Sequence, residues 1–313
     1  MTPILKFSLF LFTGLFASNS LFAQDSESKW HTRYTPAIKQ AQAENKSLIL
    51  VFTGSKWIEI CKIFESDILD QPEFVDQVSE KYVLLKLEFP KNNRMPEEIG
   101  REYQLLKDAY RVHGFPTVLV TDPEGRPFGM NGYQPVSADI YAKTLLAMLK
   151  GKEIRDTAFA KAKEQKGLDK AKTLAAGIPD LPGTLGARYY RKEIEEIIAN
   201  DPKNKTGKTE AFQKQIADVD YATNMQKLAA DVQYSKMLEL TDAYIRDQNL
   251  KGDVLQKALL NKLGVQQKQK NTAGAVQTLL EVVTVNPESH FGKSAQKMLD
   301  NLRAQKIQEN LEE

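Results

Sequence analysis

Cys61 is the only cysteine in this 313-residue chain and the side chain best suited to covalent chemistry. A thiolate attacks disulfides and oxidants, but a single cysteine cannot close a disulfide within its own chain. Three interpretations of Cys61 therefore stay open. It is a small apolar residue packed in the core, a thiol that forms a mixed disulfide with a partner or a small thiol, or a redox-sensing thiol open to oxidation.

The other chemically capable side chains form no recognisable catalytic or metal-binding pattern. His113 is interpreted as a structural loop residue, because the sequence offers it neither a nucleophile nor a carboxylate partner. His31 and His290 are too far apart in the sequence for a metal-ligand spacing, and no P-loop, zinc pattern or Ser-His-Asp order is present. We therefore expect no cofactor, no metal and no second active site.

Charge and length narrow the class of protein. Lys and Arg together number 43 and Asp and Glu 41, which gives a formal net charge of +2. Neither half of the chain is a basic module, so we expect no nucleic-acid partner. The length favours two domains of ordinary size, which must be stabilised by apolar burial because no internal disulfide is possible.

The amino terminus has the features of a signal peptide. Lys6 precedes an apolar run over residues 7–16, and Ser18, Ser20 and Ala23 supply the small residues found before a cleavage site. We predict a signal peptide at 1–23. An amino-terminal membrane anchor is the alternative, although the run is shorter than the roughly 20 residues that a span requires. No later stretch is apolar enough to span a bilayer, so no membrane association is expected after cleavage.

Helix and strand patterns alternate through residues 24–150, the first predicted domain. An apolar run at 47–52 is typical of a strand covered on both faces, and an Asp-Pro-Glu-Gly turn at 122–125 predicts a hairpin. Together these patterns predict a mixed sheet with helices on both faces. Expected strands are 47–52, 82–89, 117–121 and 126–133; expected helices are 35–46, 57–69, 72–78, 97–111 and 137–149.

Two motifs in this domain resemble those of a known family. The strand at 47–52 leads into Gly-Ser-Lys-Trp at 54–57, and Val-His-Gly-Phe-Pro-Thr stands at 112–117. In this order they resemble the bacterial exported thioredoxin-like proteins, whose signature is Gly-Ser-x-Trp-Cys-x-x-Cys-Lys followed by a Val-x-Gly-aromatic-Pro-Thr loop. The resemblance covers about residues 30–150. It implies a thioredoxin-like α/β fold, with a cis proline at Pro116 facing the redox pair.

The redox pair is incomplete. Aligned on Trp57, the first cysteine of the family falls on Ile58 and the second on Cys61. In the family the first cysteine is the exposed nucleophile and the second resolves the mixed disulfide from a shielded position. Ile58 cannot attack a disulfide, so Cys61 is the one catalytic candidate.

The groove of the family implies a binding surface that does not depend on sulfur. Its cis-proline loop offers backbone to an extended substrate segment, which permits strand-type pairing. A protein or peptide partner is therefore expected here and on the helical domain. The binding candidates are Trp57, Ile58, Phe115, Pro116 and Thr117.

Residues 151–313 are predicted to form an all-helical domain, because strand patterns nearly vanish after residue 150. Weak repeat character resembles tetratricopeptide-type hairpins, and a plain helical bundle is the alternative. The expected helices are 153–165, 168–177, 184–199, 209–230, 234–247, 253–268, 272–285 and 290–305.

The sequence thus favours a non-catalytic binding or scaffold module. The alternative is a monothiol disulfide oxidoreductase or redox sensor that uses Cys61. The resemblance favours the periplasm over full secretion, and the sequence specifies neither a partner nor an oligomeric state.

Overall fold

The structure, a computed structural model, describes residues 29–92 and 94–312. The predicted signal peptide at 1–23 lies outside these residues. None of the helices in the described ranges combines the length and the apolar character needed to cross a membrane.

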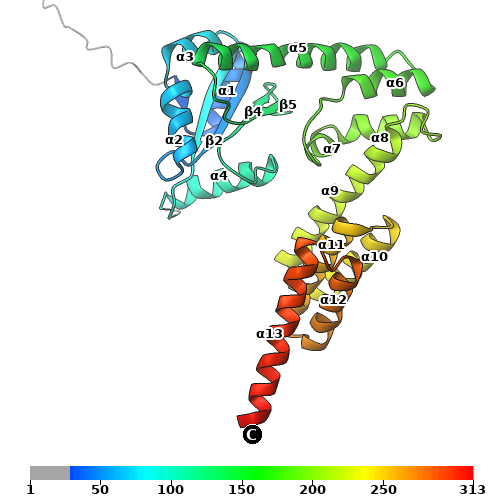
Figure 1. Cartoon of the computed structure of the whole chain (residues 1–313). Coiled ribbons are helices and arrows are strands. Elements are labelled where there is room, and N and C mark those ends of the chain that lie inside the picture. The colour runs from blue at the N-terminus through cyan, green and yellow to red at the C-terminus, as the bar shows by residue number, and fades with distance from the viewer. Residues whose placement is uncertain (1–28, 93, 313) are drawn as a thin grey trace, which may run out of the picture.

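A mixed five-stranded sheet forms the first part of the fold (Figure 1). The strand order is β1-β3-β2-β4-β5, in which β3 runs parallel to β1 and β2, while β4 runs antiparallel to β2 and β5. Every residue of β2 is buried, as the uninterrupted apolar run predicts. The strands are β1 (Trp30–His31), β2 (Ser47–Thr53), β3 (Tyr82–Glu88), β4 (Thr117–Thr121) and β5 (Pro127–Asn131).

Successive side chains along β2 point to opposite faces of the sheet, so both faces are apolar and both are covered by helices. Leu50 packs on the face covered by α1 (Tyr34–Glu44) and α4 (Glu97–Ala109), and Val51 packs on the opposite face. That opposite face is covered by α2 (Glu59–Phe64), the π-helical turn η1 (Glu65–Leu69), α3 (Pro72–Ser79) and α5 (Ala138–Ala162). The predicted α/β thioredoxin-like fold followed by a helical region is confirmed.

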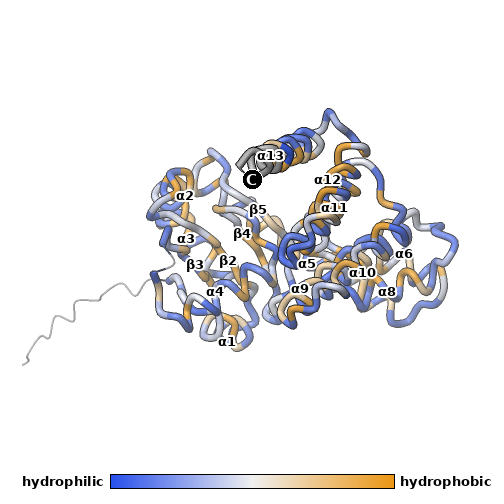
Figure 2. Tube along the Cα trace, turned by 90° about the horizontal axis from the view of Figure 1, so that it is seen from below, coloured by the Kyte–Doolittle hydropathy of each residue, from blue (hydrophilic) through white to orange (hydrophobic). Residues whose placement is uncertain are grey.

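After α5, the described residues form helices joined by loops, without strands, and hydrophobic and hydrophilic stretches alternate along these helices (Figure 2). The expected helix at 184–199 is two helices that meet at Tyr190, whose backbone leaves the helical region. Repeat character in this region stays a prediction. The helices are α6 (Gly167–Gly177), α7 (Leu185–Tyr189), α8 (Arg191–Asn200), α9 (Thr209–Ala230), α10 (Tyr234–Asp247), α11 (Gly252–Lys268), α12 (Thr272–Val285) and α13 (His290–Glu312).

A single helix, α5, joins the two parts. The sequence predicted two helices, at 137–149 and 153–165, with a break near Gly151, but α5 continues through that point. Glycine weakens a helix by about 1 kcal/mol, yet it keeps its N–H and its hydrogen bond, so it does not by itself end one. With 25 residues, α5 is about 37 Å long and extends past the sheet to pack on α6 (Figure 1).

Three hydrophobic clusters hold these elements. The cluster on the α1/α4 face of the sheet continues without interruption into α6, α8 and the start of α9, so it contains both Ala37 and Phe212. The cluster on the other face holds α2, α3 and the first half of α5. A third cluster, built from α11, α12 and α13, is separate from both.

Candidate functional site

The loop between β2 and α2 carries the remnant of the redox motif. It turns through Gly54, whose carbonyl accepts hydrogen bonds from the N–H groups of Trp57 and Ile58 at 3.0 and 2.8 Å. A Cβ at Gly54 would lie 2.8 Å from Nε1 of Trp57, so glycine leaves the room that the indole occupies. Nε1 of Trp57 donates to the carbonyl of Phe89 at 2.7 Å, and the ring is 45% exposed.

Cys61 is the third residue of α2, and its exposed fraction is 0%. It forms no disulfide. The helix expected to begin near Trp57 begins two residues later, with Ile58 as its N-cap, and Ile58 makes no side-chain capping hydrogen bond. The sulfur is therefore enclosed, while the half-buried position before the first turn carries an unreactive side chain.

Two charged side chains of β3 make polar contacts with this loop and with η1, and the sequence did not predict these contacts. Glu88, at the end of β3, accepts hydrogen bonds from the N–H and hydroxyl of Ser55 at 3.2 and 2.9 Å. Two residues earlier, Lys86 pairs with Glu65 of η1. Burial on its own raises the pKa of Glu65, but hydrogen bonds from Lys86 and Ser55 outweigh burial, so that the pKa is lowered. The signal in the sequence was the alternation of Lys86 and Glu88 in an otherwise apolar strand, which puts both on one face.

The second motif forms the loop before β4. The peptide bond between Phe115 and Pro116 is cis. The ring of Phe115 stacks on Phe89 with centroids 4.8 Å apart, and the hydroxyl of the buried Thr117 donates to the carbonyl of Gly114 at 2.8 Å. Phe89 thus contacts residues of both motifs, since its carbonyl accepts from Trp57. His113 is exposed and has no side-chain partner among the described residues.

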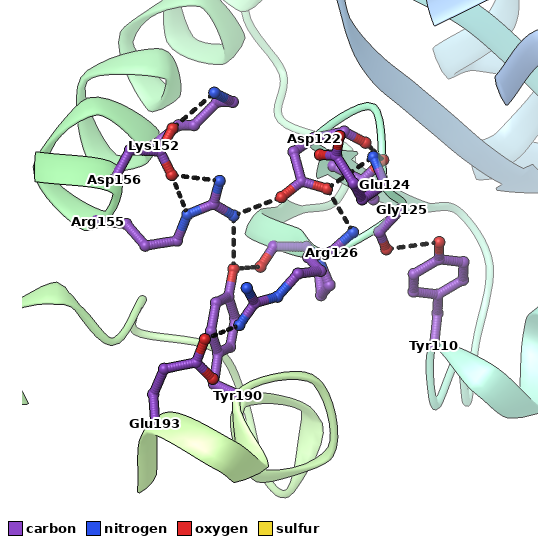
Figure 3. Close-up of polar contacts among 12 residues, drawn as sticks. Tyr110, Asp122, Glu124, Gly125, Arg126, Lys152, Arg155, Asp156, Tyr190 and Glu193 are labelled. Carbon is purple, nitrogen blue, oxygen red and sulfur yellow. Dashed lines mark hydrogen bonds and ion pairs between the residues drawn. The ribbon is translucent and has the colours of Figure 1, made fainter. Parts of the chain in front are cut away.

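A buried ion pair, which was not predicted from the sequence, joins the sheet to the helical region (Figure 3). Arg155 of α5 pairs with Asp122 at 2.9 Å, and both side chains are 4% exposed. Arg155 also donates to the hydroxyl of Tyr190 at 2.9 Å, and that hydroxyl donates to the carbonyl of Pro127 at 2.7 Å. The turn between β4 and β5 is therefore tied to α5 and to the start of α8.

Aromatic packing and a second ion pair complete this junction. The guanidinium of Arg126 lies 4.4 Å from the ring centre of Tyr190 and pairs with Glu193 at 2.7 Å. Nearby, the rings of Tyr110 and Tyr189 stack at 5.3 Å with an angle of 5° between their planes. Burial raises the pKa of Tyr189 to about 12, so it stays a neutral phenol near neutral pH.

The chemistry open to this arrangement is limited. Within residues 29–92 and 94–312, no cluster of three or more histidine, cysteine or acidic side chains is placed to hold a metal ion. The motif residues offer one enclosed thiol, an exposed indole and a cis-proline loop.

Comparisons with known proteins agree with the thioredoxin-like fold. Residues 34–149 match the family described as thioredoxin-like domain. The disulfide bond reductase DsbH of Chlamydia pneumoniae is 30% identical over 122 residues, which is 39% of this chain and 73% of that protein. The thioredoxin-related protein DsbJ of the same organism is 28% identical over 104 residues, which is 33% of this chain and 30% of that protein.

A solved structure of a DsbH oxidoreductase is also similar. It shares 30% sequence identity, with a TM-score of 0.37 and coverage of 39% of this chain and 83% of that one. The residues that match the family, 34–149, begin at α1 and end within α5. Through these residues, the chain belongs to the thioredoxin-like family.

Proposed function

We propose that this protein is an exported, non-catalytic binding module that holds an extended segment of another protein against its cis-proline loop. The observation that carries the proposal is the complete burial of Cys61 together with isoleucine at position 58. Thiol–disulfide exchange requires a thiolate that can reach a disulfide, and a dithiol cycle requires two sulfurs. Here the accessible position carries no sulfur, and the one sulfur is enclosed.

The surface around the first motif supports a binding role. Trp57 and Ile60 are 45% and 39% exposed, and half-buried Ile58 lies between them in the sequence. Exposed apolar side chains grouped on a soluble domain are typical of interaction surfaces. The nearby cis-proline loop adds backbone groups suited to an extended segment. A segment held there needs no covalent step.

Two further elements of the proposal rest on context. An exported location for this chain accords with the apolar run at its amino terminus. The relative DsbH is named as a disulfide bond reductase, which motivates the test of reductase activity below. The helical region is proposed as a second partner surface, by analogy with helical arrays that bind protein segments in a concave face.

Insulin reduction with an external dithiol tests the non-catalytic role. We expect the natural chain and Cys61→Ala to show the same background rate, because the buried sulfur takes no part. Alanine is the appropriate replacement, since serine would place a hydroxyl in the enclosed position. We expect Ile58→Cys to gain activity, because it restores a thiol at the start of a helix.

Thiol labelling of the folded chain provides a second readout of the same proposal. Cys61 should react with a neutral-pH thiol reagent only after the chain is unfolded in denaturant. Turnover by the natural chain that is lost in Cys61→Ala, together with rapid labelling of the folded protein, would replace this proposal with the monothiol enzyme.

A further inference from the structure

We propose that a pocket behind the cis-proline loop recognises a carboxylate side chain on the bound segment. The inference rests on the proposed function, because it concerns the specificity of the same groove. The pocket lies between the loop that leads into β4 and residues 182–185, which connect α6 to α7. Its volume is about 410 Å³, within the range of about 300–1,000 Å³ usual for ligand sites.

The pocket has two walls from parts of the chain far apart in sequence. Arg111, His113, Gly114 and Thr117 line it from the sheet domain, and the α6–α7 connection lines it from the helical region. His113 and Gly114 stand within three residues of Pro116. A segment laid along the cis-proline loop would need to place only one side chain at this pocket, to which the α6–α7 connection adds the second wall.

The charge of the lining favours an anion. Arg111 supplies a guanidinium, and none of the described lining residues is acidic. Arg111 makes no ion pair with any residue in the described part of the chain. An arginine offers a carboxylate two parallel N–H groups, and such charge-assisted hydrogen bonds are about twice as strong as neutral ones.

Backbone donors reinforce this preference. The N–H groups of His113 and Gly114 donate to no acceptor within the described ranges. Arg111 itself has a left-handed backbone, φ +54°, at the end of α4, where the N–H of Val112 returns to the carbonyl of Lys107 at 2.9 Å. This hydrogen-bonded helix end fixes the backbone that carries the guanidinium.

The walls are held in a fixed relation by the junction described above. Tyr110, which lines the pocket, stacks on Tyr189 of α7, so that the end of α4 is packed against the helical region. The Arg155–Asp122 pair holds the turn between β4 and β5 to α5. A pocket with both walls anchored loses little conformational freedom when a ligand binds, which favours affinity.

Fluorescence anisotropy with two labelled peptides tests this inference. Both are blocked nine-residue peptides of alternating threonine and valine; one has a central glutamate and the other a central glutamine. The natural chain should bind the glutamate peptide more tightly by about 10-fold or more, the effect of one charged hydrogen bond. Arg111→Gln should bind the two peptides equally, with an unchanged urea midpoint that shows the fold is intact.

Two further variants distinguish the effect of the Arg111 charge from the effect of filling the pocket. Arg101→Gln is the matched control, because Arg101 lies on α4, which leads to Arg111, is exposed, and forms its ion pair with Glu97 rather than with the pocket. It should keep the full preference for glutamate. Gly114→Trp should weaken both peptides, because Gly114 lines the pocket and a Cβ there meets no neighbour within 4 Å, so that a bulky side chain can occupy space that the peptides need.

The outcomes distinguish this inference from the function on which it rests. Equal binding of the two peptides by the natural chain, or an unchanged preference in Arg111→Gln, would overturn the carboxylate pocket and leave the groove as a binding site. Absence of binding by either peptide at millimolar concentration would overturn both proposals.

Discussion

Replacing Arg155 with methionine should lower the free energy of unfolding by about 3 kcal/mol. Removing one partner of a buried ion pair costs about 3–5 kcal/mol, because the other charge is left without compensation. The lower end applies here because Asp122 keeps two donors, the backbone N–H groups of Glu124 and Arg126 at 3.1 and 2.7 Å. Methionine retains the apolar stem, so little of the loss comes from packing.

Urea unfolding followed by tryptophan fluorescence and by circular dichroism measures this loss and tests whether the two probes agree. The matched control is Lys152→Met, one turn earlier on α5, whose ion pair with Asp156 is partly exposed and is expected to contribute less than about 1 kcal/mol. In a double-mutant cycle, Asp122→Asn combined with Arg155→Met should cost less than the sum of the single changes by about 1–3 kcal/mol. An Arg155→Met loss as small as that of the control would refute a stabilising role for this pair between the sheet and the helices.

Three further predictions concern other parts of the chain. Burial alone would raise the pKa of Asp201, but backbone N–H groups of the following loop donate to it and lower its pKa to about 2. Its stabilising contribution is therefore present above about pH 4 and lost as the pH falls towards 2. In Asp201→Asn, the urea midpoint should consequently fall less than in the natural chain as the pH is lowered through this range. Gly129→Ala should lower stability by about 1–3 kcal/mol in thermal unfolding, because the new Cβ would lie 2.6 Å from Sδ of Met148, whereas Gly114→Ala meets open space and should be nearly neutral. Trp57→Ala should change stability by less than about 1 kcal/mol but weaken peptide binding about 10-fold, and undiminished affinity would exclude the indole from the binding surface.

The fold was predictable because its periodic patterns are local. The apolar run within 47–52 and the turn at 122–125 each specify their element within a few residues. Boundaries were less certain where a single residue decides them. Gly151 suggested a helix end that the structure does not contain, because the helix retains its hydrogen bonds through glycine and packs on α6.

The motif residues could likewise be found from the sequence, since each motif is contiguous. The junction could not, because Asp122, Arg155 and Tyr190 are separated by more than 30 residues each and no local pattern links a charge to its distant partner. One signal was available. Arg155 stands at helical spacing with Phe159 and Ala162, which places an arginine on the apolar side of the helix, and a charge there requires a buried partner.

The hydrophobic cluster shared by the sheet and the first helices has a consequence for local unfolding. Since Ala37 and Phe212 belong to one cluster, we expect amides from the sheet through α8 to exchange with solvent hydrogen as one cooperative unit. The separate cluster of α11, α12 and α13 should open at a lower free energy, as a unit of its own. The carboxyl-terminal helices can then open while the sheet and the loop at Pro116 keep their shape.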